Sequence, residues 1–363
     1  TALGSLAGRA AAATRGTACL SLALEDVRPW APGTPFLYDL EMLVRRGGEV
    51  ADRVTSYFGL REIAIRGKEV LLNGRPLFQR LVLDQGYYPD GIYTAPSDEA
   101  LRRDIELAQA MGFNGARLHE KVFEPRFLYW ADKLGYLCWG EYPNWGVNHA
   151  HPGALGRILP EWLEAVARDF NHAAVVGWCP FNETPRDQDP ELLRAVYRAT
   201  KAVDPTRPVI DTSGYVHVET DIYDCHSYQQ DPAAFAALFE PFKTSGAPWR
   251  NWPDHDAAYA GQPYFVSEYG GIWWNPGQAD EKGWGYGGAG ARPRTEQEFL
   301  ERYRLLTEVL LSHPKMFGFC YTQLYDVEQE VNGLHTYDRR PKFAPAVISA
   351  INSKRAAVEG GAG

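Results

Sequence analysis

Short apolar segments alternate with amphipathic segments from about residue 62 to residue 355 of this 363-residue chain, and this alternation restricts the fold more than any other feature. Eight segments have the length and apolar character of strands: residues 77–83, 113–118, 136–140, 175–181, 208–211, 221–225, 264–267 and 317–321. Seven segments have helical periodicity or helix-capping residues: residues 98–111, 125–134, 160–170, 190–203, 232–239, 295–312 and 344–350. Regular strand–helix alternation predicts a parallel sheet covered by helices.

The length of the alternating region distinguishes between two parallel architectures. Residues 62–355 come close to the roughly 250 residues that a (β/α)8 barrel needs. A doubly wound open sheet is the rival, but no glycine-rich phosphate turn follows the first strand. We therefore predict an α/β fold in which residues 62–355 form a (β/α)8 TIM barrel.

Two of the predicted strands end in a glutamate. Asn182 and Glu183 follow the apolar residues 175–181, and Glu268 follows residues 264–267 and precedes two glycines. In a barrel the carboxyl ends of the strands form the active-site face. Two carboxyl groups on that face are what a glycosidase requires, one to protonate the leaving oxygen and one to attack or stabilise the anomeric centre. The alternative, two ordinary loop carboxylates, does not explain why both occupy the same kind of position.

Charge and composition argue against several kinds of partner. The net charge is −9 and no basic block occurs, so nucleic acid and anionic membrane are not expected partners. No apolar run approaches the roughly 18 residues of a membrane span, and residues 1–17 lack the continuous apolar run of a signal peptide. The 11 Trp, 20 Tyr and 16 Phe suit a large aromatic core and also a site that stacks on sugar rings. Carbohydrate is therefore the expected partner.

The spacing and number of the cysteines predict the redox state of the cellular compartment. They lie far apart without CxxC spacing, and four of them fall in or beside predicted strands: Cys19, Cys138, Cys179, Cys225 and Cys320. Such residues are typical of buried thiols and not of disulfides or metal ligands. The odd count favours a reducing, cytoplasmic location. We expect no cofactor and no bound metal.

The residues before the barrel predict a smaller unit. Residues 1–16 are rich in Ala, Gly and Arg and are predicted to be disordered. Residues 17–61 predict a short antiparallel β unit with strands at 19–25, 36–44 and 50–60, which is too short for a complete seven-stranded sandwich. Residues 356–363 are predicted to be a tail.

Several motifs resemble glycoside hydrolase family 2, the group of β-galactosidases, β-glucuronidases and β-mannosidases. They occur in the family's order: LNGRP at 72–76, GFNGAR at 112–117, FLYWADKLG at 127–135, NE at 182–183, SEYG at 267–270 and DVEQEVNGL at 326–334. Residues 20–60 resemble the end of the immunoglobulin-like domain that precedes the barrel in this family. The resemblance implies a retaining β-glycosidase.

The resemblance also implies roles for individual residues. Glu183 corresponds to the acid/base and Glu268 to the nucleophile. Asn182 corresponds to the residue that binds the sugar 2-hydroxyl, and Arg117 and Tyr228 correspond to residues that hold the nucleophile. In such a retaining mechanism the two carboxyl groups lie about 5–5.5 Å apart.

Four further residues have two interpretations each. His119 follows Arg117 and is either part of the site or part of a solvated loop. His226 is a site residue or a hydrogen-bonded core histidine. Trp273 follows the nucleophile and is a sugar platform or packs its loop onto the barrel rim. Tyr321 ends the last strand, where an aromatic ring could form the floor of the site.

Departures from the family pattern bear on the substrate. The glucuronidases carry an Asn-x-Lys near the eighth strand, whereas residues 331–334 here read VNGL, so glucuronic acid is disfavoured. Some β-galactosidases take metal ligands from a Glu-x-His after the third strand, but residues 141–145 here read EYPNW. A terminal β-galactoside is the favoured substrate, and a mannoside, arabinoside or glucuronide is the alternative.

The sequence also leaves a second class of function open. The family's N-terminal sugar-binding β domain does not occur in this sequence, so a truncated barrel that binds carbohydrate with little turnover is the alternative to an enzyme. A homo-oligomer is a further option, because another subunit could cover apolar surface that missing domains expose.

Overall fold

The computed structural model describes residues 21–278 and 282–360. The predicted disorder of residues 1–16 lies outside these residues. Part of the predicted tail is structured, because residues Ala357–Gly360 form a 3-10 helix. Glu359 in this helix pairs with Arg80 of the barrel at 2.7 Å, which anchors the described end of the chain.

Seven parallel strands form the curled sheet of the barrel. Around the sheet their order is β10-β11-β12-β6-β7-β8-β9. The strands are β6 (Gln79–Asp84), β7 (Gly115–Leu118), β8 (Leu137–Glu141), β9 (Val175–Cys179), β10 (Tyr223–Ser227), β11 (Tyr264–Gly270) and β12 (Met316–Thr322). The pairing of β12 with β6 brings the last barrel strand beside the first, as the predicted barrel requires.

The eighth position of the barrel, between β9 and β10, is held by an irregular segment. Residues 208–213 make two parallel bridges to the β9 side, Trp178–Val209 and Asn182–Ser213. On the other side the Asp221 amide donates to the Val209 carbonyl at 3.0 Å. The segment predicted at 208–211 therefore occupies the expected place and pairs with the β9 side through its backbone, although its pairing is too irregular to form a continuous strand.

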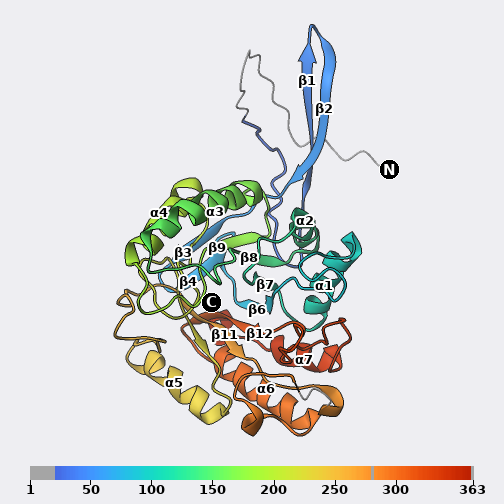
Figure 1. The fold of residues 1–363 in the computed structure, drawn as a ribbon. Coiled ribbons are helices and arrows are strands. Elements are labelled where there is room, and N and C mark those ends of the chain that lie inside the picture. The colour runs from blue at the N-terminus through green and yellow to red at the C-terminus, as the bar shows by residue number, and fades with distance from the viewer. Residues whose placement is uncertain (1–20, 279–281, 361–363) are drawn as a thin grey trace.

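Seven helices cover the outside of the sheet, as the alternation predicts (Figure 1). They are α1 (Asp98–Ala110), α2 (Pro125–Leu134), α3 (Leu155–Asp169), α4 (Pro190–Val203), α5 (Pro232–Thr244), α6 (Glu296–Leu311) and α7 (Pro345–Asn352). Shorter 3-10 turns occur at Pro152–Ala154, Pro276–Gln278 and Ala289–Ala291. Ser97 caps α1 and Thr295 caps α6, each by accepting a hydrogen bond from a backbone amide of the first turn. The predicted start of α3 at Pro160 is wrong, because the helix begins five residues earlier and Pro160 lies inside it.

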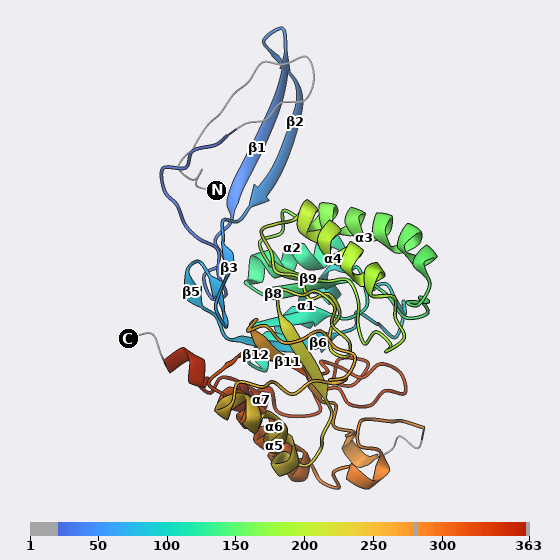
Figure 2. The ribbon, with the colours of Figure 1, turned by 90° about the vertical axis from the view of Figure 1, so that its left-hand side faces the viewer.

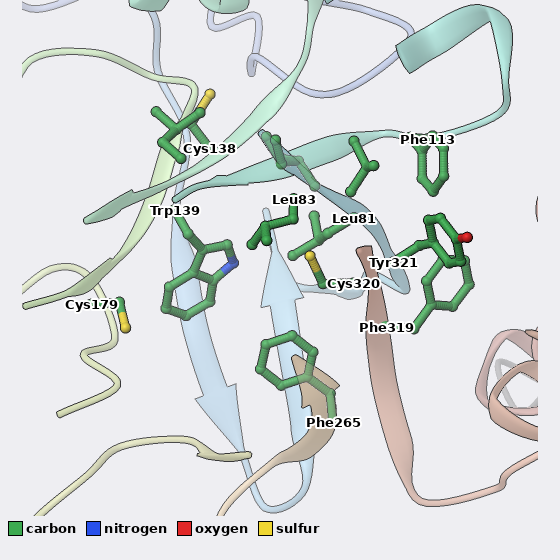
Figure 3. Close-up of a cluster of buried hydrophobic side chains, with 14 of the residues drawn as sticks. Leu81, Leu83, Phe113, Cys138, Trp139, Cys179, Phe265, Phe319, Cys320 and Tyr321 are labelled. Atoms are coloured by element: carbon green, nitrogen blue, oxygen red, sulfur yellow. The ribbon is translucent and has the colours of Figure 1, made fainter. Parts of the chain in front are cut away.

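Large aromatic side chains fill the barrel interior. Trp139 and Phe265 stack with ring centroids 6.5 Å apart beside Leu81 and Cys320 (Figure 3). A side chain at Gly177 would meet the Trp139 ring at 2.2 Å, so only glycine leaves room for this indole between β8 and β9. The predicted aromatic core is therefore present. Among the described cysteines, Cys138, Cys179, Cys225 and Cys320 are buried free thiols, as expected.

The N-terminal part is a β unit that extends away from the barrel (Figure 2). Strands β1 (Tyr38–Arg46) and β2 (Glu49–Phe58) pair as a hairpin that turns at residues 47–48, as predicted. A second small sheet, β3 (Ile63–Arg66), β4 (Glu69–Leu72) and β5 (Arg75–Pro76), joins it to the barrel. The strand expected at 19–25 does not form over the described residues 21–25. In the part of the chain that is described, no helix is both long and apolar enough to cross a lipid bilayer.

Candidate active site

The two predicted glutamates lie on the same end of the barrel. Glu183 follows β9 and Glu268 lies in β11, and both side chains are largely buried. His226 of β10 lies beside both, and the nearest ligand atoms of the three side chains are within 4.8 Å of one another. The rule that barrel strands present functional groups at their carboxyl ends therefore places these groups correctly.

Arg117 connects four strands at the centre of the site. Its guanidinium, which is fully buried, donates to Glu268 at 2.9 Å and to Glu141 at 2.7 Å. It also donates to the Asn182 side chain at 3.0 Å and to the Ser267 carbonyl at 3.0 Å. One arginine thus orients two carboxylates and one amide, because its planar guanidinium presents five N–H donors in fixed directions.

Glu268 is held in its ionised form. The nearby His226, Arg117 and His119 and a hydrogen bond from Tyr228 together outweigh the effect of burial and lower the pKa of Glu268 to about 2. The Tyr228 hydroxyl donates to Glu268 and lies 3.2 Å from the Thr322 hydroxyl. Glu268 is therefore a carboxylate over the whole neutral pH range.

Glu183 has a different kind of partner. Its carboxyl lies 2.7 Å from Nδ1 of His226. Nε2 of His226 lies 2.9 Å from the Ser213 hydroxyl, whose own proton goes to the carboxylate of Asp224 at 2.9 Å. Nε2 is therefore the donor to Ser213, which leaves Nδ1 to make the hydrogen bond with Glu183. Glu183 and His226 share one proton in this arrangement.

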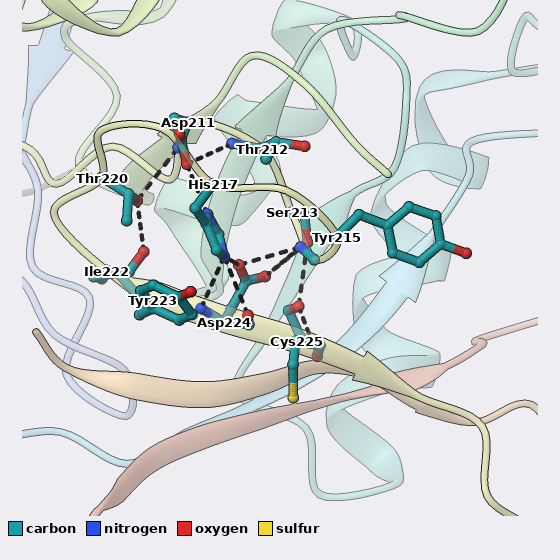
Figure 4. A network of polar contacts seen from close by, with 12 residues as sticks. Asp211, Thr212, Ser213, Tyr215, His217, Thr220, Ile222, Tyr223, Asp224 and Cys225 are labelled. Carbon is teal, nitrogen blue, oxygen red and sulfur yellow. Dashed lines mark hydrogen bonds and ion pairs between the residues drawn. The ribbon is translucent and has the colours of Figure 1, made fainter. Parts of the chain in front are cut away.

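A buried polar cluster supports this side of the site (Figure 4). Asp224 accepts from Ser213 and lies 3.0 Å from Nε2 of His217, and Asp211 lies 2.7 Å from Nδ1 of the same ring. The two carboxylates outweigh burial and hold the pKa of His217 well above its ordinary value. The cluster fixes residues 211–217, which include the end of the irregular segment between β9 and β10.

The protein's own hydrogen bonds fix the position of Asn182. The side-chain oxygen of Asn182 accepts from Arg117. Its backbone amide donates to the side chain of Asn144, and its backbone carbonyl accepts from Asn144 Nδ2 at 3.2 Å. Its amide nitrogen and carbonyl are thus occupied, and the Nδ2 group of Asn182 remains as a donor at the site.

His119 joins the site through Glu141. Its ring lies 3.2 Å from the Glu141 carboxylate. Burial alone would lower the pKa of His119, but this hydrogen bond and the charges of Glu141 and Glu268 raise it to about 9. His119 is therefore a cation at neutral pH. Its largely buried ring rules out the solvated-loop interpretation, and its role in the site stays a prediction.

We expect the protein to lose stability as His119 deprotonates. The folded-state pKa of about 9 lies above the ordinary value of 6.5, so the contribution is complete below about pH 6.5 and disappears as the pH rises through 9. Urea unfolding midpoints of the wild-type chain and His119→Gln should therefore converge over this window. For the control His151→Gln, at an exposed histidine, the unfolding midpoint should differ from that of the wild-type chain by the same amount at every pH. A constant offset for His119→Gln as well would contradict the charge state assigned to His119.

Two other predicted residues are placed differently. The Trp273 ring lies under the Arg292 guanidinium at 4.4 Å, which supports the rim-packing interpretation, and a role on sugar stays a prediction. Tyr321 is fully buried and packs on Tyr303 of α6, with ring centroids 4.8 Å apart. Tyr321 thus faces the helix layer and does not form the floor of the site.

Sequence reasoning missed several residues that the structure adds. Glu141 is the last residue of β8, so the rule that drew attention to glutamates near the carboxyl ends of strands could have identified it. Tyr286 stacks on Tyr228 with centroids 3.3 Å apart, although it lies in a loop far along the chain. Glu330 accepts from Gln85 at 3.1 Å, and no local signal points to this contact.

One group among the described residues has the composition of a metal site. It consists of Glu183, His226 and Glu268. The same atoms are hydrogen-bonded to one another, to Arg117 and to Tyr228. The protein's own donors therefore account for this cluster, and a cation would have to compete with Arg117 for Glu268.

Comparison with known proteins gives matches over most of the chain. The family model described as "Glycosyl hydrolases family 2, TIM barrel domain" matches residues 63–350, and the model "Glycosyl hydrolases family 2" matches residues 4–61. A β-galactosidase of Pseudoalteromonas haloplanktis is 24% identical over 339 residues, and the match covers 84% of this chain and 32% of the relative. A β-glucuronidase of Rattus norvegicus is 30% identical over 182 residues, and the match covers 48% of this chain and 28% of the relative.

Solved structures agree in fold. The β-D-glucuronidase of Dictyoglomus thermophilum superposes with a TM-score of 0.75 at 21% identity, over 92% of this chain and 60% of that one. At this identity the likeness is one of fold alone. The chain spans less than a third of the length of the two curated relatives.

Proposed function

The chain belongs to glycosyl hydrolase family 2, and we propose that it acts as a retaining exo-β-glycosidase with Glu268 as nucleophile and Glu183 as acid/base. The observation that carries the proposal is the pair of carboxyl groups with opposite environments. Glu268 is held ionised by Arg117 and Tyr228, whereas Glu183 shares a proton with His226. Two carboxyl groups in contrasting environments are the parts that this chemistry needs.

The spacing supports a retaining mechanism. The nearest oxygen atoms of Glu183 and Glu268 lie within 4.8 Å, close to the roughly 5–5.5 Å of retaining enzymes and below the roughly 6.5–9.5 Å of inverting ones. A water molecule does not fit beside the anomeric carbon at the shorter spacing, so the second carboxylate is close enough to attack it directly.

In the first step a Glu268 oxygen attacks the anomeric carbon. The bond to the leaving oxygen breaks, and that oxygen takes the proton shared by Glu183 and His226. In the second step Glu183 accepts a proton from water, and the resulting hydroxide attacks the same carbon. The bond to Glu268 breaks and the carboxylate is restored, still paired with Arg117.

A β-galactoside is the favoured substrate of this proposal. The β-galactosidase among the relatives and the absence of a lysine in residues 331–334 both support a neutral sugar. Glu330 supports the same conclusion, because this half-buried carboxyl offers no positive charge to a uronate. Another β-glycoside, such as a mannoside, arabinoside or glucuronide, is the alternative.

Replacing Glu183 by alanine tests the reaction class. We expect hydrolysis of β-glycosides with poor leaving groups to fall by about 10²- to 10⁴-fold, the usual contribution of general acid–base catalysis. For a dinitrophenyl glycoside, whose leaving group needs no proton, the rate of the first step should fall much less. Added azide should restore turnover and yield the β-glycosyl azide, because azide needs no general base.

The wild-type chain is first assayed with a panel of α- and β-nitrophenyl glycosides. Turnover of one β-glycoside would identify the sugar, and product of inverted configuration would contradict the double displacement. A folded wild-type chain that binds sugars but turns over none of the panel would favour the carbohydrate-binding alternative.

A further inference from the structure

An aromatic pair lies on the Glu183 side of the site and has no part in the mechanism above. The Tyr215 ring centroid is 6.0 Å from that of His226, whose Nδ1 binds Glu183. Trp252 meets the Tyr215 ring edge-on with centroids 6.3 Å apart, and 36% of Trp252 is exposed. The pair therefore extends from the proposed acid/base to the surface.

The backbone of Tyr215 is held in an unfavourable conformation. Its φ is +59°, a value that bulky residues rarely adopt. The amide of the preceding Gly214 donates to the Asp224 carboxylate at 3.1 Å, which fixes the turn. Figure 4 shows the Tyr215 ring extending away from the polar cluster around Asp224. Strained residues of this kind persist where the surrounding structure enforces them, and they are concentrated at binding and catalytic sites.

Hydrogen bonds of the Asn251 side chain fix the loop that carries Trp252. The Asn251 side chain accepts from the amide of His226 at 3.0 Å and from the amide of Tyr215 at 3.4 Å, and it donates to the His226 carbonyl at 2.9 Å. The Arg186 guanidinium lies 4.5 Å from the Trp252 ring, which restricts the indole further. Both rings are thus preorganised relative to β10.

The phenol end of Tyr215 faces the carboxyl groups. Burial and the nearby carboxylates of Glu183 and Glu268 raise the pKa of Tyr215 to about 12. The hydroxyl therefore stays protonated at neutral pH and can donate to Glu183 or to an oxygen bound next to it.

We propose that Tyr215 and Trp252 form a platform for the leaving group, and that this group is a pyranose ring or an aromatic ring. The inference rests on the proposed role of Glu183. An acid that protonates the leaving oxygen lies within roughly 2.6–3.2 Å of it, so the ring that carries this oxygen must lie on the Glu183 side. Tyr215 and Trp252 are the aromatic rings that the structure holds there, and the C–H face of a sugar or the face of an aryl group can stack on them.

Trp252→Ala tests the platform. The variant should slow the step in which the leaving group is still bound, and it should not slow the later step in which that group has departed. For a disaccharide with the preferred terminal sugar, we expect kcat/KM to fall about tenfold, because one stacking contact is lost. For a dinitrophenyl glycoside under conditions in which hydrolysis of the glycosyl-enzyme limits the rate, kcat should not change, because the leaving group has already departed. Transfer of the glycosyl group from the enzyme to an added aryl glycoside should become slower relative to hydrolysis, whereas its transfer to azide should not.

Two further variants guard against indirect effects. Tyr215→Gly removes the ring at a backbone position that glycine adopts freely, so the chain should fold and show the same pattern. Trp145→Ala removes a more exposed tryptophan, 61% exposed, on the loop after β8, and should leave all of these ratios unchanged. The proposal would be overturned if the platform variants lost activity equally on every substrate, or if neither variant lost activity on the disaccharide. It would also be overturned if Trp145→Ala showed the same loss.

A binding measurement separates this inference from the proposed function. Calorimetric titration of phenyl β-glycoside into the wild-type chain, Trp252→Ala and Tyr215→Gly needs no turnover. If the wild-type chain hydrolyses nothing but binds the glycoside more tightly than both variants, the platform stands and the hydrolase proposal fails. If all three chains bind it equally, the platform is overturned whatever the turnover.

Discussion

Replacing Glu268 by glutamine is expected to abolish glycoside hydrolysis while leaving sugar binding intact. The amide keeps the shape of the side chain but cannot form the glycosyl ester, so we expect kcat to fall by roughly 10⁴-fold or more, as is usual when a nucleophile is removed. The amide oxygen can still accept from Arg117, which lies 2.9 Å from the carboxylate. The measurement is the steady-state rate on the best β-nitrophenyl glycoside, together with the affinity for the same sugar by calorimetry.

A matched carboxylate and a chemical label make this test specific. Glu328 is exposed in the loop after β12, and Glu328→Gln should keep the wild-type rate. A 2-fluoro glycoside of the preferred sugar should leave its mass on the peptide that contains Glu268 in the wild-type chain and on no peptide of Glu268→Gln. Retention of most of the rate by Glu268→Gln, or label on another residue, would show that the role assigned to Glu268 is wrong.

The positions of the two glutamates could be predicted because they follow from local pattern and one topological rule. Apolar stretches before Glu183 and Glu268 indicate strands, and parallel strands present their carboxyl ends on one face. The seven helices could be predicted for the same reason, since each has its own periodicity or cap. The failure at Pro160 also has a local cause, because proline is far commoner in the first turn of a helix than inside it.

Tyr321 shows where local pattern stops being informative. Side chains alternate between the two faces of a strand, so an error of one residue exchanges the inner and outer face. The strand runs one residue beyond the predicted end, and Thr322 is the residue that reaches Tyr228. The sequence contains no signal that distinguishes these two registers.

Long-range polar contacts are the other part that could not be predicted. Arg117 and Glu141 are 24 residues apart and lie on neighbouring strands, and the Ser213–His226 contact depends on an irregular segment in place of a strand. Residues 208–213 carry the signal of a short strand and pair with the β9 side through backbone hydrogen bonds, but side-chain bonds such as the one from Ser213 to Asp224 also hold them. Such pairs follow from the closed barrel and not from the residues beside them.

Removing the Arg117 side chain is expected to reduce both stability and activity by large amounts. Arg117→Met leaves the carboxylates of Glu141 and Glu268 buried without their shared cation. Breaking a buried ion pair from one side costs about 3–5 kcal/mol in the free energy of unfolding. The control Arg126→Met breaks an exposed pair with Asp98 at 2.8 Å and should cost at most about 1 kcal/mol. Urea unfolding of the three chains measures the difference.

The same substitution has a consequence for activity that stability alone would not produce. The charge of Arg117 is one of the factors that lower the pKa of Glu268 to about 2, so its loss should raise that pKa and move the acid limb of kcat/KM to higher pH. Arg117→Lys keeps a charge and should fold, but its ammonium group cannot reach Glu141, Glu268 and Asn182 together, so its acid limb should lie between those of wild type and Arg117→Met. If Arg117→Met is too unstable to assay, Arg117→Lys alone decides the outcome. An acid limb unchanged from wild type in Arg117→Lys, together with a large loss of rate, would mean that Arg117 shapes the site without controlling the charge of Glu268.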